Sequence, residues 1–244
     1  MVSVQNLSLS LDDKPILKDI SFELGDENNL VILGRSGSGK TVLSKTLMGF
    51  FPPQQGRVII DHVDIYQNSS NNLESDKSQF AIVFQNAALL DSLSVFQNVA
   101  LPLYTRGEKD LEKVKEKVRQ ALCEVGLEDE GDKFPAQLSG GMRKRVGIAR
   151  ALVYEPRYIV FDEPVSGLDP ITANEVLYYI NRIVESETAT TITITHDVRN
   201  LERVGDMVLF LEAGEALYYG SLDDLSQTTS PLIRDFFGFG PLEK

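Results

Sequence analysis

The segment from Gly34 to Thr41 constrains the fold of this chain more than any other stretch. It reads Gly-Arg-Ser-Gly-Ser-Gly-Lys-Thr and matches the pattern G-x-x-x-x-G-K-[ST] of a phosphate-binding loop. The apolar run 30–33 enters it and predicts a short buried strand, while residues 41–48 carry apolar side chains at helical spacing. A strand, a glycine loop and a helix start are the context that this motif requires. These flanks disfavour the alternative, a Gly/Ser turn that precedes Lys-Thr by chance.

The residue types in this loop suit a phosphate group. Glycines let backbone N–H groups converge on an anion, and the N-terminus of the following helix adds its positive end at the same point. Lys40 is suited to neutralise the β- and γ-phosphates, and the Thr41 hydroxyl is suited to hold Mg²⁺. We expect the nucleotide to contact the whole loop, namely Gly34, Arg35, Ser36, Gly37, Ser38, Gly39, Lys40 and Thr41.

Length and composition indicate an ordinary globular protein. The 244 residues allow one large α/β domain or a core with a subdomain, and no apolar run approaches the ~20 residues of a membrane span. The first residues lack the basic and apolar regions of a signal peptide. The single cysteine, Cys123, excludes an internal disulfide framework and is expected to pack within a helix. These features favour a reducing, cytoplasmic setting.

The net charge of −12 limits the partners. Backbone binding to nucleic acid needs a cationic face, and direct binding to anionic lipid needs one too. We therefore expect no nucleic-acid partner, and we expect that a protein partner holds the chain at any membrane where it works. The one dense basic run, 143–145, is the only local patch that could evade this argument.

Hydrophobic periodicity predicts an alternation of strands and helices. We expect a hairpin around a turn at 12–15 and a surface loop at 68–72, and helical character begins near Leu89. The expected strands are 7–11, 16–24, 30–33, 56–60, 80–84, 158–161, 190–195, 207–211 and 215–219, and the expected helices are 41–48, 111–125, 138–152, 173–184 and 198–204.

Two further segments carry candidate chemistry. The apolar strand 158–161 ends in Asp162, suited to hold Mg²⁺ through its water shell, and Glu163, suited to polarise an attacking water. The run Leu138–Met142 opens a helix with a serine and two glycines, which can form a second anion site. On the residues alone, an ordinary glycine-rich helix cap is an equally good explanation of this run.

In this order, these motifs resemble the nucleotide-binding subunits of ABC transporters. The resemblance covers nearly the whole chain and implies roles for single residues. Gln85 matches the residue that links nucleotide, Mg²⁺ and the membrane partner, and His196 matches the switch histidine that acts with Lys40 and Glu163 in catalysis. The family signature corresponds to Leu138, Ser139, Gly140, Gly141 and Met142, and the loop that joins two subunits corresponds to Ser166, Gly167, Leu168 and Asp169.

The resemblance implies an α/β fold: a P-loop NTPase core with an N-terminal antiparallel β subdomain and an inserted α-helical subdomain. We expect one ATP-binding domain over 1–244. Its core would be 1–88 and 156–220, its helical signature subdomain 89–155, and its C-terminal extension 221–244. The family pairs two such subunits, homodimeric here, with ATP and Mg²⁺ between the loop of one and the signature of the other. An integral-membrane permease would receive the motion at the cytoplasmic face of the inner membrane.

Narrower features point to a subfamily. In 138–152, residues Met142-Arg143-Lys144 stand where the general family more often has Gln-rich residues. Together with 84–103 and 161–173, this segment resembles the ATPases of Mce/Mla-type systems, which move phospholipid between bacterial envelope membranes. The alternatives are an importer ATPase for an amino acid or metal complex, and a soluble ATPase of DNA repair or translation. The last class typically has two cassettes or a long coiled coil.

Some positions depart from the family pattern or extend it. The adenine-stacking aromatic corresponds to Leu11, and Val165 replaces the usual threonine. Thr46 is also assigned to the ATP site. The apolar segment 85–103 predicts either the core of the helical subdomain or a groove for a permease helix, with Leu90, Leu93 and Phe96 on one helical face. The apolar run 235–240 is expected to dock on a partner or to fold back on its own core.

Overall fold

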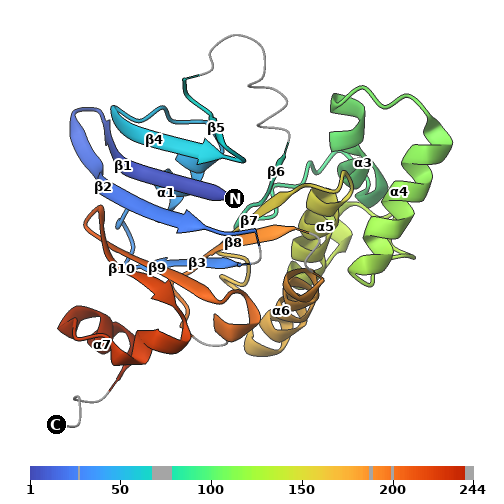
Figure 1. Cartoon of the computed structure of the whole chain (residues 1–244). Coiled ribbons are helices and arrows are strands. Elements are labelled where there is room, and N and C mark those ends of the chain that lie inside the picture. The colour runs from blue at the N-terminus through green and yellow to red at the C-terminus, as the bar shows by residue number, and fades with distance from the viewer. Residues whose placement is uncertain (27, 68–78, 187–188, 199–200, 240–244) are drawn as a thin grey trace. The chain divides into compact units, whose positions relative to one another are not determined.

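The structure is a computed structural model that describes residues 1–26, 28–67, 79–186, 189–198 and 201–239. It forms two compact units (Figure 1). The first comprises Met1–Phe80 and Thr190–Lys244, and the second comprises Ala81–Ala189. The domain boundaries expected from the sequence fall elsewhere and stay a prediction. The expected surface loop at 68–72 lies outside the described residues.

An antiparallel sheet opens the first unit. Its order is β2-β1-β4-β5, formed by β1 (Val2–Leu11), β2 (Lys14–Leu24), β4 (Gln55–Ile60) and β5 (Val63–Asp64). Alternating apolar side chains of β1 and β2 are buried, which confirms the predicted hairpin. The turn is shorter than expected, because only Asp12 and Asp13 form it, both at positive φ. Lys14 and Pro15 already pair with β1, and an edge strand such as β2 tolerates a proline.

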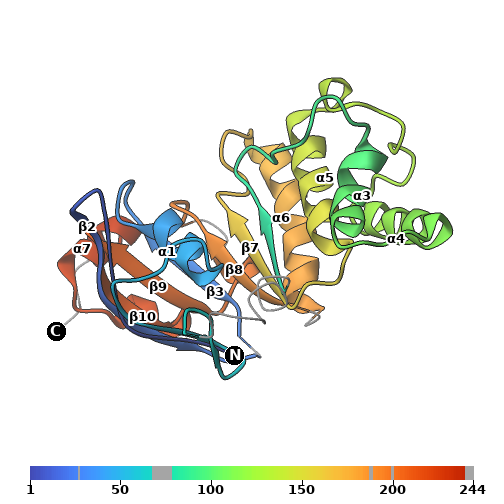
Figure 2. The ribbon, with the colours of Figure 1, turned by 90° about the horizontal axis from the view of Figure 1, so that it is seen from above.

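A second set of strands in this unit follows the order β10-β9-β3-β8. These are β3 (Leu30–Gly34), β8 (Thr190–Ile194), β9 (Met207–Glu212) and β10 (Glu215–Ser221). β3 runs parallel to both β8 and β9, and every residue of β3 and β8 is buried. This explains their continuous apolar or β-branched runs. Helix α1 (Lys40–Leu47) follows β3 within this unit (Figure 2).

The C-terminal elements of the first unit are short. The short helix expected over 198–204 is, in the described residues, a 3₁₀ turn at Leu201–Arg203, and residues 199 and 200 lie outside the described part. A second 3₁₀ segment (Asp223–Gln227) leads to α7 (Pro231–Phe237). The rings of Phe236 and Phe237 contact Phe210 of β9, with centroids 4.9 and 6.4 Å away. The apolar tail therefore packs on its own unit as far as residue 239.

The second unit is mainly helical. It contains β6 (Phe80–Val83) from its second residue on, β7 (Tyr158–Asp162), α3 (Val95–Thr105), α4 (Leu111–Glu124), a 3₁₀ turn (Pro135–Gln137), α5 (Gly140–Leu152) and α6 (Pro170–Glu185). Strand β7 neighbours β6, and α5 packs against α3, α4 and α6. Helix α5 is therefore the central helix of this unit, and small residues on it allow close packing.

Helix α3 begins later than the sequence suggested. Ser94 caps it in a reciprocal box, because its hydroxyl accepts from the Gln97 N–H while the Gln97 side chain accepts from the Ser94 N–H. Leu90 and Leu93 precede this cap, so the expectation that they share a helical face with Phe96 was wrong.

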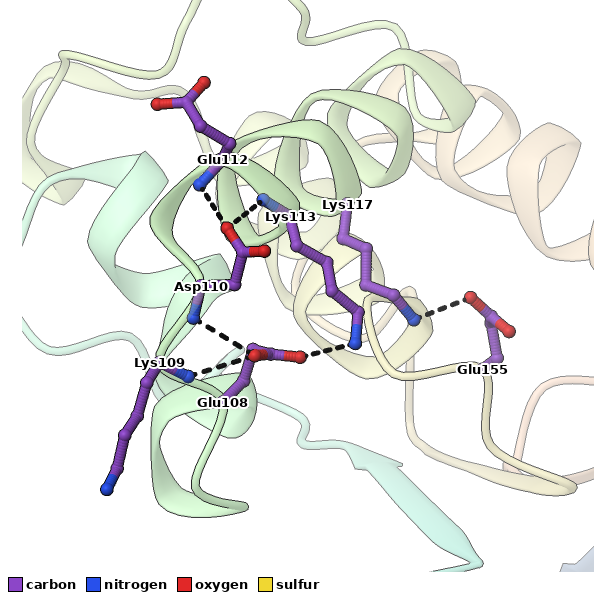
Figure 3. Close-up of polar contacts among 7 residues, drawn as sticks. All are labelled: Glu108, Lys109, Asp110, Glu112, Lys113, Lys117 and Glu155. Atoms are coloured by element: carbon purple, nitrogen blue, oxygen red, sulfur yellow. Dashed lines mark hydrogen bonds and ion pairs between the residues drawn. The ribbon is translucent and has the colours of Figure 1, made fainter.

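Helix α4 confirms the predicted amphipathic pattern. Its buried stripe is Val114, Val118, Ala121 and Leu122. Asp110 caps its first turn, and Glu108 accepts from two backbone N–H groups while pairing with Lys113 at 2.6 Å (Figure 3). The hydrogen bond from Lys113 holds the pKa of Glu108 below its usual value. Cys123 is exposed on this helix, so the expectation that it packs inside was wrong.

Candidate functional site

The loop between β3 and α1 has a backbone that only glycine fits comfortably. Gly34, Gly37 and Gly39 have φ values of 148°, 82° and 105°. A Cβ on Gly34 would lie 2.1 Å from the Leu211 carbonyl oxygen, and one on Gly39 would lie 2.9 Å from Leu17 Cδ2. The loop is therefore a narrow backbone cradle at the carboxyl end of β3.

Lys40 and Ser38 line this cradle from inside. The Lys40 ammonium is buried and donates to the carbonyl oxygens of Gly34 at 2.8 Å and Arg35 at 3.0 Å. The Ser38 hydroxyl oxygen is also buried, and it has no hydrogen-bond partner among the described residues. A cation held at a helix N-terminus beside an unsatisfied buried hydroxyl suits a ligand with several anionic oxygens. The Thr41 side chain is exposed at the same helix end.

Two hairpins of the first unit hold the loop in place. The Gly214 N–H donates to the Ser38 carbonyl oxygen at 3.2 Å, and the Gly214 carbonyl oxygen accepts from the Lys18 N–H at 2.8 Å. Leu11 is the last residue of β1. It pairs with Lys14 across the hairpin turn and is half-buried. The hairpin that carries Leu11 therefore lies against the loop through its strand β2.

His196 follows β8, the strand next to β3. Ile194 pairs with Ile32, and the Thr195 N–H donates to the Ile32 carbonyl oxygen at 3.2 Å. The Thr195 hydroxyl accepts from the Asp197 N–H at 3.0 Å. Because parallel strands end at one sheet edge, His196 emerges exposed at the edge where the loop leaves β3.

The second unit has its own polar edge. Asp162 ends β7 and Glu163 follows it, with Gln85 shortly after the neighbouring strand β6. The Gln85 side-chain amide donates to the Ser166 hydroxyl at 3.1 Å. Glu163 has a φ of 49°, a left-handed conformation that costs a non-glycine residue on the order of 1 kcal/mol. Such strain persists only where neighbours impose it, and it is typical of functional sites.

The predicted signature forms the N-terminus of α5. Ser139 caps it by accepting from the Met142 N–H at 3.2 Å, and its side chain is exposed. A Cβ on Gly141 would lie 2.4 Å from Thr172 Cγ2, and one on Gly140 would lie 3.2 Å from Leu168 Cδ2. The glycines therefore let this helix end approach the segment 166–172 closely.

The predicted subunit-joining loop ends in a helix cap. The Asp169 carboxylate accepts from the N–H groups of Ile171 and Thr172 and, at 2.6 Å, from the Thr172 hydroxyl. The Thr172 hydroxyl is the main reason that the pKa of Asp169 lies below its usual value. Gly167 is exposed, and its Cβ position would meet no atom within 4 Å. The loop is thus anchored at its end and open at Gly167.

Thr46 lies at the opposite end of α1 from the glycine loop. It is fully buried in the last turn of α1, and its hydroxyl donates to the Val42 carbonyl oxygen at 2.8 Å. Its assignment to the ATP site stays a prediction that this geometry does not support.

Sequence reasoning missed two cations of α5. Residues 143–145 looked like a basic surface patch, but Lys144 is buried and donates to the carbonyl oxygens of Gln85 and Glu163. Arg150 donates to the carbonyl oxygens of Ala87 and Ala88. Burial lowers the pKa of Lys144, although the charges of Glu163 and Asp162 oppose this effect. The available signal was spacing, since Lys144 is four residues before the buried Ile148.

Fold and site together define a class. A parallel strand, a glycine cradle closed by a lysine and a helix N-terminus constitute a phosphate-loop nucleotide-binding protein, here with a second glycine-rich helix end and a strand-end carboxylate pair.

The comparisons give the family. Residues 17–166 match the family model described as ABC transporter, and the chain belongs to this family. It is an ABC ATPase subunit that couples ATP hydrolysis to transport. The expected ABC ATPase fold is confirmed. In the part of the chain that the structure describes, no helix combines the length and apolar character needed to cross a membrane.

Three curated relatives carry different names. The chain is 34% identical to the "Probable ribonucleotide transport ATP-binding protein mkl" of Mycobacterium leprae, over 99% of this chain and 70% of that protein. It is 35% identical to the "Methionine import ATP-binding protein MetN" of Carboxydothermus hydrogenoformans, over 97% and 71%. It is 32% identical to the chloroplastic "Protein TRIGALACTOSYLDIACYLGLYCEROL 3" of Arabidopsis thaliana, over 97% and 73%.

A solved structure is similar over most of this chain. It is the dimeric post-hydrolysis state of the ATP-binding cassette MJ0796 bound to ADP and Pi. The TM-score is 0.80 at 29% identity, and the match covers 91% of this chain and 99% of that one.

Proposed function

We propose that this chain powers a lipid transporter of the bacterial envelope, of the Mce/Mla type, from the cytoplasmic face of the inner membrane. The segment 138–152, with Met142-Arg143-Lys144 after the signature glycines, supports this narrower assignment. The Arabidopsis relative is named for a diacylglycerol lipid, which is consistent with it. The methionine-import relative supports the second candidate, an ATPase that drives uptake of a small solute.

The observation that carries nucleotide binding is the cradle around Ser38. The Lys40 ammonium and the unsatisfied Ser38 hydroxyl are both buried inside a loop whose glycines leave the backbone open. Lys40 and the loop N–H groups would hold the β- and γ-phosphates of ATP, and Leu11 would pack against the base.

Hydrolysis would require the side chains that follow β7 and β8. Glu163 would accept a proton from the water that attacks the γ-phosphorus, and His196 would contact the γ-phosphate. Within the described ranges, no group of three or more His, Cys, Asp and Glu side chains could hold a metal ion alone. Oxygen donors do suit Mg²⁺, which would be held by Thr41, Gln85 and Asp162 beside the nucleotide and would neutralise its phosphate charge.

A second copy of the chain would complete each site. The exposed Ser139 hydroxyl and the N-terminus of α5 would form an anion site. This site is about a hundred residues away in sequence from the phosphate loop. In the proposed homodimer this helix end would face the γ-phosphate held by the other subunit, with 166–169 at the joint. The similar cassette is named as a dimer, which is consistent with this pairing.

The permease would dock near Gln85. Phe84 and Leu90 are 38% and 47% exposed, which is high for large apolar side chains. Leu93 and Phe96 are half-buried beside them. A short helix of the permease could cover this surface, and the acidity of the chain favours basic residues at the rim of that helix.

The substrate test uses the intact complex. The chain is tagged, purified from membranes with its permease and reconstituted in vesicles that contain labelled phospholipid. ATP-dependent transfer of the phospholipid, absent with Lys40→Ala, supports the lipid assignment. Stimulation of ATP hydrolysis by methionine or another small solute, without lipid transfer, would show the importer function instead.

A further inference from the structure

Lys144 is a buried cation whose hydrogen-bond acceptors, among the described residues, are backbone carbonyl oxygens. Its residue is 6% exposed, and its ammonium donates to two backbone carbonyl oxygens, that of Gln85 and, at 3.4 Å, that of Glu163. Burying a lysine is unfavourable unless its donors are satisfied. An apolar or amide side chain would avoid this cost, so the charge at this position needs an explanation beyond packing.

The two acceptors are the residues that follow neighbouring strands. Gln85 comes after β6 and Glu163 after β7, and one ammonium reaches both backbones. Glu163 also has the strained φ of 49°. The Lys144 ammonium, which donates to the Glu163 carbonyl oxygen, stabilises this backbone conformation. The backbone conformation in turn sets the direction of the Glu163 side chain.

Helix α5 also contacts the residues that follow Gln85, through Gly147 and Arg150. A Cβ on Gly147 would lie 3.3 Å from the Ala87 Cβ, so glycine lets the helix approach that residue. Arg150 donates to the carbonyl oxygens of Ala87 at 2.5 Å and Ala88 at 2.7 Å. Residues 144, 147 and 150 are spaced by three and lie on one helix face. Both alanines have positive φ values, 56° and 46°.

We propose that Lys144 is a positioning residue: it ties the signature helix to the backbone of Glu163 and Gln85, so that the general base is aligned only while α5 holds its place. This inference rests on the proposed roles of Glu163 and of the Ser139 helix end. In this role Lys144 would act through Glu163 and not by contact with the nucleotide. It joins, within one rigid helix, the end that would meet the partner's phosphate and the residue that would activate water.

The experiment compares three substitutions with a matched control. Lys144→Met keeps the length and removes the donors, Lys144→Gln is the polar alternative, and Lys144→Arg keeps charge and donors. The control is Lys117→Met, which removes a half-buried lysine paired with Glu155 at 2.9 Å (Figure 3). For each variant, kcat for ATP hydrolysis, the Kd for ADP and the melting temperature are measured.

The positioning role predicts a split between rate and affinity. Lys144→Met and Lys144→Gln should lower kcat at least about tenfold while the Kd for ADP stays within about twofold. Lys144→Arg should recover most of the rate, and Lys117→Met should resemble the wild type. Amide exchange should rise at 85–88 and 163–166 in Lys144→Met but not in the control.

Other results overturn the role. A folded Lys144→Met with a near wild-type kcat, an equal loss of rate and affinity, or a Lys144→Arg no better than Lys144→Met would each contradict it. If both Met and Gln variants fail to fold, Lys144 is only structural. Glu163→Gln is measured alongside, because near wild-type hydrolysis by that variant overturns the proposed role of Glu163. An inactive Glu163→Gln with an active Lys144→Met overturns the positioning role alone.

Discussion

The Gly214 N–H donates a hydrogen bond of 3.2 Å to the carbonyl oxygen of Ser38, so the turn between β9 and β10 supports the phosphate loop from behind. Gly214 has a φ of 85°, and a Cβ there would lie 2.3 Å from the Ile16 carbonyl oxygen. Gly214 therefore helps to fix the conformation of the phosphate loop, although it is far from the loop in sequence.

Gly214→Ala should displace this turn and loosen the loop. We expect a loss of about 2–4 kcal/mol in the free energy of unfolding and about tenfold weaker ADP binding, measured by denaturation and calorimetry. The control is Gly107→Ala, since Gly107 has a φ of 87° but no atom within 4 Å of the added Cβ. That control should cost about 1 kcal/mol and leave ADP binding unchanged. Equal effects of the two substitutions would refute the supporting role.

Tyr66 anchors the far end of α1. Its hydroxyl donates to the carbonyl oxygens of Thr46 at 2.7 Å and Phe51 at 2.8 Å, and burial raises its pKa. Tyr66→Phe should lower the free energy of unfolding by about 1–2 kcal/mol, because it leaves these acceptors without the phenol donor. Tyr104→Phe, at a tyrosine that is 43% exposed, should change it by less than about 0.5 kcal/mol. Indistinguishable denaturation midpoints would show that the bonds contribute nothing.

The contribution of the Glu108–Lys113 ion pair to stability should depend on pH. Because the folded-state pKa of Glu108 is depressed, its contribution to stability is present above the unfolded-state pKa and is lost as pH falls through the folded-state pKa. Glu108→Gln should therefore be less stable than the wild type at neutral pH, with the difference shrinking toward zero in acid. NMR titration should place the carboxyl pKa lower in the wild type than in Lys113→Met. A difference in stability that does not vary with pH would contradict this account.

The proposed base contact of Leu11 predicts loose nucleotide selectivity. A leucine can pack on a purine but lacks an aromatic face, so GTP should compete well with ATP. Leu11→Tyr should tighten ATP binding by up to ~1–3 kcal/mol, the range for base–aromatic stacking. Leu11→Ala separates lost packing from gained stacking. If both substitutions leave the ATP and GTP affinities unchanged, another residue supports the base.

Much of the fold and site could be predicted because local patterns carry them. Alternation in 7–11 and 16–24 indicated a hairpin, and the glycine spacing in 34–41 indicated a cradle whose φ values only glycine tolerates. The predicted start of α3 was too early, because the Ser94 capping box fixes where the helix begins despite the apolar character of Leu90 and Leu93.

Other features depend on contacts between segments far apart in sequence. The buried state of Lys144 depends on carbonyl groups 59 and 19 residues away. The periodicity of the sequence does not contain this information. The exposure of Cys123, by contrast, follows from periodicity, because its position nine residues after the buried Val114 places it on the opposite face of α4.

The central claim is that Glu163 activates the water that cleaves ATP. The most direct measurement is the steady-state rate of ATP hydrolysis by Glu163→Gln beside the wild type, because the substitution preserves size and hydrogen-bonding capacity while removing the base. The rate should fall at least about 10²-fold while ATP is still bound, and gel filtration in ATP should show a persistent dimer. Hydrolysis near the wild-type rate would contradict the assignment.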